Sequence, residues 1–148
     1  MALDPKVIIA DEAVSALDVS IQSQILNLIN ELRSRLQLSI IFISHDLSVI
    51  NYISDTVAVM YSGKIIEIGP TNDIMNKPKH PYSQLLLASV PTISFSKKTR
   101  DLKFEGEPPD PSIQTIGCAF YSRCPKNQKN AKMKFPSYKP KTIMRNTK

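Results

Sequence analysis

The 148-residue sequence has little cysteine, little glycine and no long apolar run. Two cysteines allow at most one disulfide, which excludes a cross-linked secreted scaffold, so we expect Cys118 and Cys124 to be reduced thiols. No apolar run approaches the ~20 residues that span a bilayer, and the amino terminus lacks a secretory signal pattern. No two of the four glycines are five positions apart, which excludes a Gly-x-x-x-x-Gly-Lys phosphate loop. These absences favour a cytoplasmic globular protein.

Charge and proline divide the sequence into two parts. Residues 1–95 carry 6 basic and 9 acidic side chains, whereas residues 96–148 carry 13 basic and 4 acidic ones. Of the 11 prolines, only Pro5 precedes position 70. We therefore expect a regular domain over residues 1–90, followed by a basic, proline-rich and irregular extension over residues 91–148.

The first part has the pattern of an α/β protein. Lys6–Ala10 and Ser39–Ser44 are β-branched runs without alternation, which is typical of buried parallel strands. Between them, Asp18 or Ser20 can cap an amphipathic helix. The apolar stripe of that helix consists of Ile21, Ile25, Leu28, Ile29, Leu32 and Leu36. The order strand, helix, strand predicts a parallel crossover.

Shorter elements are expected beyond the second strand. Ser62-Gly63 is a two-residue turn between the strands of a hairpin. The strands are expected at Thr56–Tyr61 and Lys64–Ile68, and helices at Asp46–Ser54, Thr71–Asn76 and Pro81–Val90. Leu85, Leu86 and Val90 would form the apolar side of the last helix.

Three polar clusters follow these elements and can carry chemistry. Asp11 and Glu12 end the first strand, where Asp11 could hold Mg²⁺ and Glu12 could activate water for nucleotide hydrolysis. By itself the pair fits two solvated acids equally well. Considered by itself, Asp18 is interpreted as a helix cap. His45 follows the second strand, where it could donate to a phosphate oxygen or serve as an ordinary hydrogen-bonded histidine.

Taken together, the clusters resemble three motifs of one family. Val7-Ile-Ile-Ala-Asp-Glu12, Ser15-Ala-Leu-Asp18 and Ile43-Ser-His-Asp-Leu47 resemble the Walker B, D-loop and H-loop of ABC-transporter ATPases. The resemblance covers almost the whole chain, through Pro125. Its later part looks like ATPases of oligopeptide and dipeptide importers, and it rests on Val59–Pro70, His80-Pro-Tyr82, Gly106-Glu-Pro-Pro109 and Gly117–Pro125.

This resemblance implies a partial P-loop NTPase-type fold and a set of residue roles. Asp11 would be the Mg²⁺-site acid, Glu12 the general base, His45 the γ-phosphate contact and Asp18 a dimer-interface residue. The implied cofactors are ATP and Mg²⁺. The implied partners are membrane permease subunits and a second ATPase subunit, at the cytoplasmic face of the membrane.

The sequence departs from the family in what it lacks. It has neither the phosphate loop nor a Leu-Ser-Gly-Gly-Gln signature, and Ala13 stands where the family commonly has proline. We therefore expect the carboxyl-terminal half of an ATPase that is not catalytically competent alone, with an amino-terminal half as a further partner. The alternative is a non-enzymatic remnant or interaction module with no ATPase function.

The extension offers two further features. Cys118 and Cys124 resemble cluster positions that bind iron and sulfur in some importer ATPases, but Ala131 occupies the next cysteine position. Because such clusters usually need four thiolates, structural thiols are the preferred interpretation. Arg123–Lys148 has nine basic and no acidic residues, which fits contact with nucleic acid or anionic lipid, or a solvated tail. Nucleic acid is not an expected partner, because no recognisable binding fold accompanies the charge.

Overall fold

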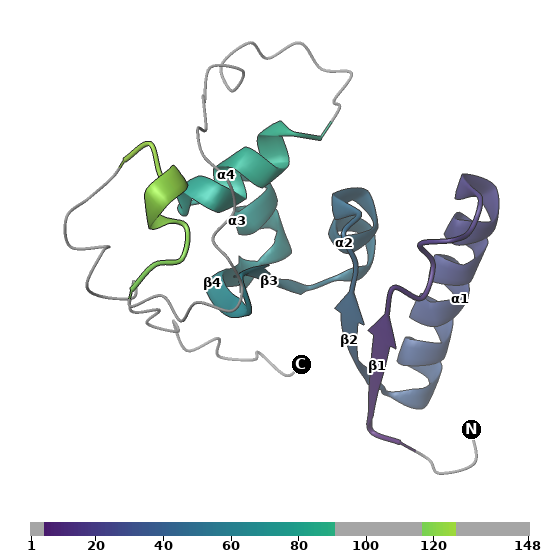
Figure 1. Ribbon diagram of the computed structural model, residues 1–148. Coiled ribbons are helices and arrows are strands. Elements are labelled where there is room, and N and C mark those ends of the chain that lie inside the picture. Colours follow the sequence, from purple (N-terminus) through teal and green to yellow (C-terminus); the bar gives the residue numbers. More distant parts are fainter. Residues whose placement is uncertain (1–4, 91–116, 127–148) are drawn as a thin grey trace. The chain divides into compact units, whose positions relative to one another are not determined.

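The structure, a computed structural model, describes residues 5–90 and 117–126 and divides the chain into two compact units between Asp55 and Thr56 (Figure 1). The expected boundary between a regular domain over residues 1–90 and an irregular extension over residues 91–148 stays a prediction. The proline-rich Gly106–Pro111 segment and the basic residues 127–148 lie outside the described residues.

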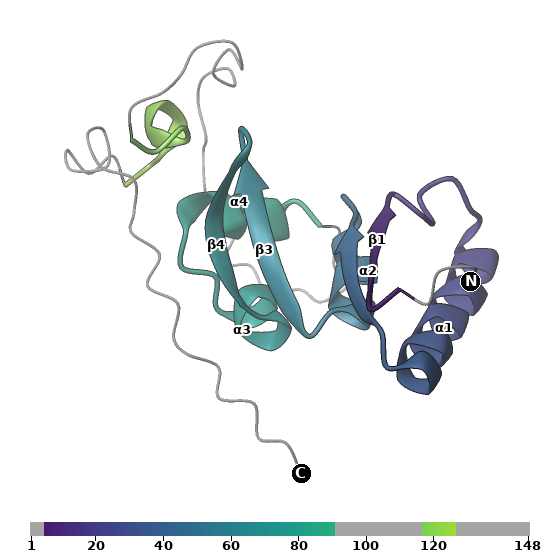
Figure 2. The ribbon, with the colours of Figure 1, turned by 90° about the horizontal axis from the view of Figure 1, so that it is seen from below.

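The first unit is a parallel crossover, which confirms the expected α/β class. Its elements are β1 (Val7–Asp11), α1 (Val19–Leu36), β2 (Ser39–Ile43) and α2 (Leu47–Ile53). β1 and β2 pair in parallel, with Ile9 opposite Ile41 (Figure 2). Their carboxyl ends therefore meet at one edge of the sheet.

The core of this unit lies between the sheet and its two helices. Its buried members are Val14, Leu26, Val49 and Ile53, against which Ile25, Ile29 and Phe42 pack. The predicted stripe of α1 is therefore only partly right. Leu26, the one buried residue of the helix, was missed, while Ile21, Leu28 and Leu36 are exposed. Apolar residues lie around much of the circumference of α1, so helical periodicity alone does not identify which of them face the core.

The expectation that both strands are buried on both faces is wrong. Phe42 faces the helices, but every second residue of each strand is exposed in the described structure. Ile9, for example, keeps 67% of its surface accessible and Ile41 keeps 54%. The core helices α1 and α2 share the Phe42 side of the sheet, so only that face is covered.

The second unit is built on an antiparallel hairpin. β3 (Thr56–Tyr61) pairs with β4 (Lys64–Pro70) around Ser62 and Gly63. Both turn residues have positive φ, 45° and 73°, which is the geometry of the tight turn that suits the twist of paired strands. The helices α3 (Thr71–Asn76) and α4 (Pro81–Ala88) follow, and Tyr121–Arg123 forms a short 3-10 helix.

An aromatic cluster holds the second unit together. Phe120 is completely buried, and its ring centroid lies 5.3 Å from that of Tyr61 and 5.4 Å from that of Tyr82. Tyr61 and Tyr82 contact each other at 4.7 Å. The last helix is shorter than expected and ends at Ala88, so Val90 lies beyond it. Leu85, Leu86 and Val90 are half-buried, whereas the small Ser83 is fully buried next to Tyr82.

His80 joins three parts of the second unit. Its Nδ1 accepts the Tyr82 backbone N–H at 3.1 Å and so caps α4. Its Nε2 lies 3.7 Å from the Cys118 Sγ. The Glu67 carboxylate accepts the backbone N–H groups of Lys79, at 2.8 Å, and His80, at 3.1 Å. A neutral imidazole is required for the cap, because a protonated Nδ1 cannot accept.

Acid is therefore expected to weaken the second unit through His80. Burial lowers the pKa of His80, with a smaller opposing effect from Glu67, so the folded state favours the neutral ring. The neutral His80 ring therefore makes its full contribution to stability above the ordinary histidine pKa of about 6.5. This contribution is lost as the pH falls from there through the lowered pKa of His80 in the folded state. His80→Asn keeps a cap acceptor that does not titrate. Urea unfolding between pH 7.5 and 5 should show a smaller loss of stability in H80N than in the native chain. Equal losses would contradict the role of His80.

Within the described parts of the chain, no helix combines the length and the apolar character that crossing a membrane requires.

Candidate functional site

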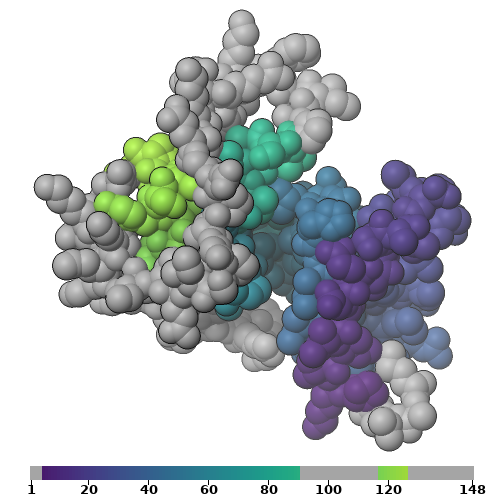
Figure 3. All heavy atoms as spheres, in the orientation of Figure 1, coloured from purple at the N-terminus to yellow at the C-terminus, as the bar shows by residue number. Residues whose placement is uncertain are grey.

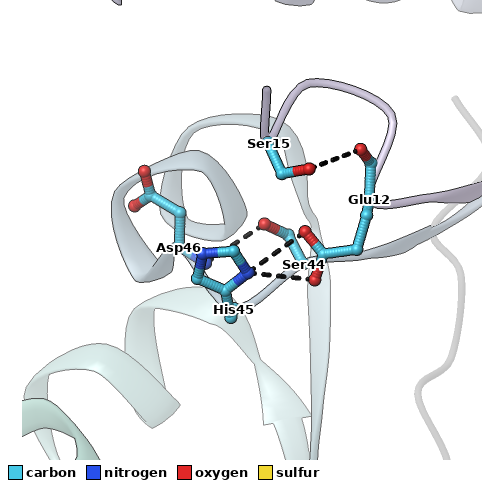
Figure 4. Close-up of polar contacts among 5 residues, drawn as sticks. All are labelled: Glu12, Ser15, Ser44, His45 and Asp46. Carbon is cyan, nitrogen blue, oxygen red and sulfur yellow. Dashed lines mark hydrogen bonds and ion pairs between the residues drawn. The ribbon is translucent and has the colours of Figure 1, made fainter. Parts of the chain in front are cut away.

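Glu12 sits at a sharp turn where β1 ends. Its φ is +48°, a left-handed backbone conformation that is uncommon for a side chain other than glycine. The Glu12 N–H donates to the Ile43 carbonyl at 3.0 Å, and the Glu12 carbonyl accepts the Ser15 hydroxyl at 3.0 Å (Figure 4). These bonds hold a conformation that costs about 1–3 kcal/mol. Strained backbone of this kind is concentrated at functional sites.

His45 reaches the Glu12 carboxylate from the neighbouring strand. His45 follows β2, and its Nδ1 lies 3.1 Å from each of the two Glu12 carboxylate oxygens. A carboxylate only accepts hydrogen bonds, so Nδ1 must carry a proton in this contact. The side chains are 78% and 40% exposed for His45 and Glu12, so the pair is open to solvent and to a ligand.

Two polar neighbours fix the backbone on either side of His45, and sequence reasoning missed these contacts. The Asp46 carboxylate caps α2 by accepting the N–H groups of Ser48, at 2.8 Å, and Val49, at 3.4 Å. The Ser44 hydroxyl accepts the Asp46 N–H at 3.1 Å (Figure 4). The signal was present, since Asp-x-x before an apolar run is typical of a helix start. This cap anchors the backbone from which His45 extends.

The other two predicted residues stand apart from this pair. Asp11 is the last residue of β1, exposed and opposite Ile43 in the register. Asp18 is the residue before α1, as expected of a cap, but its side chain makes no capping hydrogen bond. The structure therefore brings Glu12 and His45 into contact, while Asp11 lies at the same sheet edge and Asp18 at the start of a helix.

This edge fits a magnesium–phosphate ligand in its donor chemistry. The described residues contain no group of three or more His, Cys, Asp or Glu side chains that could enclose a metal ion. Mg²⁺ does not need such a cage, because it binds through one or two carboxylates together with phosphate oxygens and water. An exposed Asp11 at the carboxyl edge of a parallel sheet can serve as that carboxylate.

Cys118 and Cys124 are both free in the structure. Cys118 is buried, and this burial raises the pKa of its thiol. A buried thiol with a raised pKa is a weak nucleophile and loses its proton to a metal reluctantly. The preference for structural thiols over iron–sulfur ligands stays a prediction.

Known proteins resemble this chain along most of its length. Residues 66–130 match the family described as "Oligopeptide/dipeptide transporter, C-terminal region". The chain is 49% identical over 124 residues to the dipeptide transport ATP-binding protein DppF of Escherichia coli, covering 84% of this chain and 37% of that protein. It is 46% identical over 141 residues to the oligopeptide transport ATP-binding protein AppF of Bacillus subtilis, covering 94% of this chain and 43% of that protein.

A third relative gives the same result. The dipeptide transport ATP-binding protein DppF of Haemophilus influenzae is 49% identical over 124 residues, which cover 84% of this chain and 38% of that protein. The chain thus spans about two fifths of the length of these relatives. The resemblance expected from the motifs is confirmed.

Proposed function

We propose, from the homology of this chain to the carboxyl-terminal part of peptide ABC-transporter ATP-binding proteins, that it carries one portion of an ATP-hydrolysing site that drives peptide import. The observation that supports this proposal most strongly is the Glu12–His45 contact, with both nitrogen–oxygen distances at 3.1 Å. Two strand ends bring a carboxylate and an imidazole to one exposed edge, where they can serve as a general base and as a hydrogen-bond donor to a phosphate.

Glu12 is suited to the role of general base. Its side chain is held at the strained turn, accepts a hydrogen bond from His45 and remains 40% exposed. Positioning the attacking water and accepting its proton is a typical task for such a carboxylate. Asp11, one residue earlier, would hold Mg²⁺. When bound, that ion neutralises charge on the phosphates.

His45 is suited to contact the terminal phosphate. Because Nδ1 donates to Glu12, the opposite nitrogen, Nε2, is available to a ligand. Nε2 donates to a phosphate oxygen only when the ring carries both protons. Nδ1 remains hydrogen-bonded to Glu12. Through the same contact His45 orients the Glu12 carboxylate.

We further propose the partners and the location that the family implies. Asp18 would lie at the contact with a second ATPase subunit, and the assembled protein would bind permease subunits at the cytoplasmic face of the membrane. The test is to join these 148 residues to the part of the Escherichia coli relative outside the match. ATP hydrolysis by the joined protein would support the proposal. A folded joined protein that binds ATP without hydrolysing it would oppose it.

The 148 residues alone are expected to bind MgATP no tighter than ~1 mM, or about −4 kcal/mol. The reason is that Asp11 and Glu12 repel a polyanion and the sequence has no phosphate loop to offset them. This lack favours the second candidate function, a non-enzymatic interaction module, for the chain acting alone. Isothermal titration calorimetry with MgATP tests the expectation, and micromolar affinity would contradict it.

A further inference from the structure

The positive charge of this protein is concentrated in the last 26 residues of the sequence. Arg123–Lys148, which we call the basic segment, carries nine lysine and arginine side chains and no aspartate or glutamate. Residues 1–95, by contrast, carry 6 basic and 9 acidic side chains. Solvated protein surfaces normally mix both signs of charge, whereas a block of one sign is typical of a segment that binds a charged partner. The basic segment therefore fits an anionic partner.

The structure fixes the start of the basic segment on the second unit. Phe120 is completely buried in the aromatic cluster, and its carbonyl accepts the Arg123 N–H at 3.1 Å. Pro125 and Lys126 are exposed. The atoms of residues 117–126, green in Figure 3, are visible at the surface of the molecule. The basic segment therefore begins at an anchored loop and reaches solvent within a few residues.

A further cation lies near this loop. Lys64 is exposed at the turn of the β3–β4 hairpin. Burial raises the pKa of the Cys118 thiol, and the charge of Lys64 acts in the opposite direction. Because the interaction between charges falls with distance, Lys64 must lie near residues 117–126. Its charge adds to that of Arg123 and Lys126 where the basic segment begins.

The surface of an anionic membrane fits the basic segment better than a nucleic acid does. Each lysine or arginine near an anionic leaflet adds to binding, and clusters of about 4–8 of them are typical of segments that bind anionic lipid. Apolar side chains among the cations add to binding by entering the boundary between headgroups and acyl chains, and the segment has Met133, Ile143 and Met144. Single-stranded nucleic acid is bound by stacking bases on aromatic side chains, of which the segment has only Phe135 and Tyr138 besides the half-buried Tyr121 that precedes it.

We propose that the basic segment binds the anionic lipid headgroups of a membrane surface directly, without a permease subunit. The match to the transporter family ends at residue 130, and six of the nine basic side chains lie beyond it. Most of the charge therefore lies outside the region that the family shares. The contact goes beyond the proposed function, since it requires neither ATP nor a second subunit. It should weaken with salt, which shortens the range of charge interactions from about 10 Å at 0.1 M to about 3 Å at 1 M.

Co-sedimentation of the 148-residue chain with lipid vesicles tests the proposal. Vesicles of phosphatidylcholine mixed with phosphatidylglycerol should pellet the chain at about 0.05 M salt and release most of it at about 0.5 M. Vesicles of phosphatidylcholine alone should not pellet it, because they carry no net charge. The triple variant Lys132→Gln, Lys134→Gln and Lys139→Gln should bind the anionic vesicles about a hundredfold more weakly, since each cation near the surface contributes roughly fivefold.

The matched control removes the same amount of charge elsewhere in the chain. Lys6, Lys77 and Lys79 are exposed and lie outside the basic segment. Their joint replacement by glutamine gives the same net charge as the first triple variant, so it separates the clustered charge from the charge of the whole chain. The control should bind the anionic vesicles within about twofold of the native chain. Near-ultraviolet circular dichroism of the tyrosines verifies that both variants are folded.

Several results would overturn the proposal. They are failure of the native chain to pellet with anionic vesicles at low salt, equal binding to both kinds of vesicle, and equal losses in the two triple variants. Displacement of the chain from the vesicles by a single-stranded oligonucleotide at equal phosphate concentration would identify nucleic acid as the preferred partner and would also overturn it. None of these measurements involves ATP hydrolysis, so their outcome is independent of the proposed function.

Discussion

Glu12→Gln is expected to slow ATP hydrolysis by about 10²–10⁴-fold in a protein that joins these 148 residues to the remainder of a relative. Glutamine preserves the size of the side chain and can still accept a hydrogen bond from His45 through its carbonyl oxygen. It cannot take a proton from water. Because the lost interaction belongs to the transition state, kcat should fall while affinity for ATP stays within about threefold.

The matched control for this prediction is Glu31→Gln. Glu31 is exposed on α1, so the same chemical change occurs away from the strand ends. Steady-state hydrolysis and binding of a fluorescent ATP analogue separate the two effects. If Glu12→Gln retained more than about a tenth of the native rate, Glu12 would not be the general base.

Local sequence patterns predict where helices and strands form, but they do not predict which faces of the strands are exposed. The strands, α2 and the Ser62-Gly63 turn were predictable because each is specified by adjacent residues. The exposure of Ile9 and Ile41 was not, because a continuous apolar run shows that a strand is suited to burial on both faces. It does not show whether a neighbour is present to cover them.

The candidate site was predictable to the level of its strand ends. Since parallel strands end at the same edge, the sequence predicts that Glu12 and His45 lie at one edge, where the structure brings them into contact. The positive φ of Glu12 was not predictable, because glycine is the usual residue in that conformation. The buried position of Phe120 was equally hidden, because its partners Tyr61 and Tyr82 are distant in sequence.

Phe120→Ala is expected to destabilise the second unit by about 3–5 kcal/mol. Phe120 is 0% exposed and contacts Tyr61, Tyr82 and the His80 ring, whose centroid is 6.1 Å away. Truncation removes the transfer free energy of the ring, leaves a cavity and breaks edge-on aromatic contacts. Because small domains are stable by only about 5–15 kcal/mol, this single change removes a large fraction of that stability.

Met60→Ala provides the control for Phe120→Ala. Met60 lies in the same unit on β3 but is 57% exposed, so its truncation should cost less than about 0.5 kcal/mol. Unfolding in urea can be followed by the near-ultraviolet circular dichroism of the clustered tyrosines, since the chain has no tryptophan. The free energy of unfolding should drop far more for Phe120→Ala than for Met60→Ala. Similar small losses in both variants would mean that residues 117–126 do not dock on the hairpin in solution. The His80–Cys118 contact would then contribute nothing to the acid sensitivity of the unit.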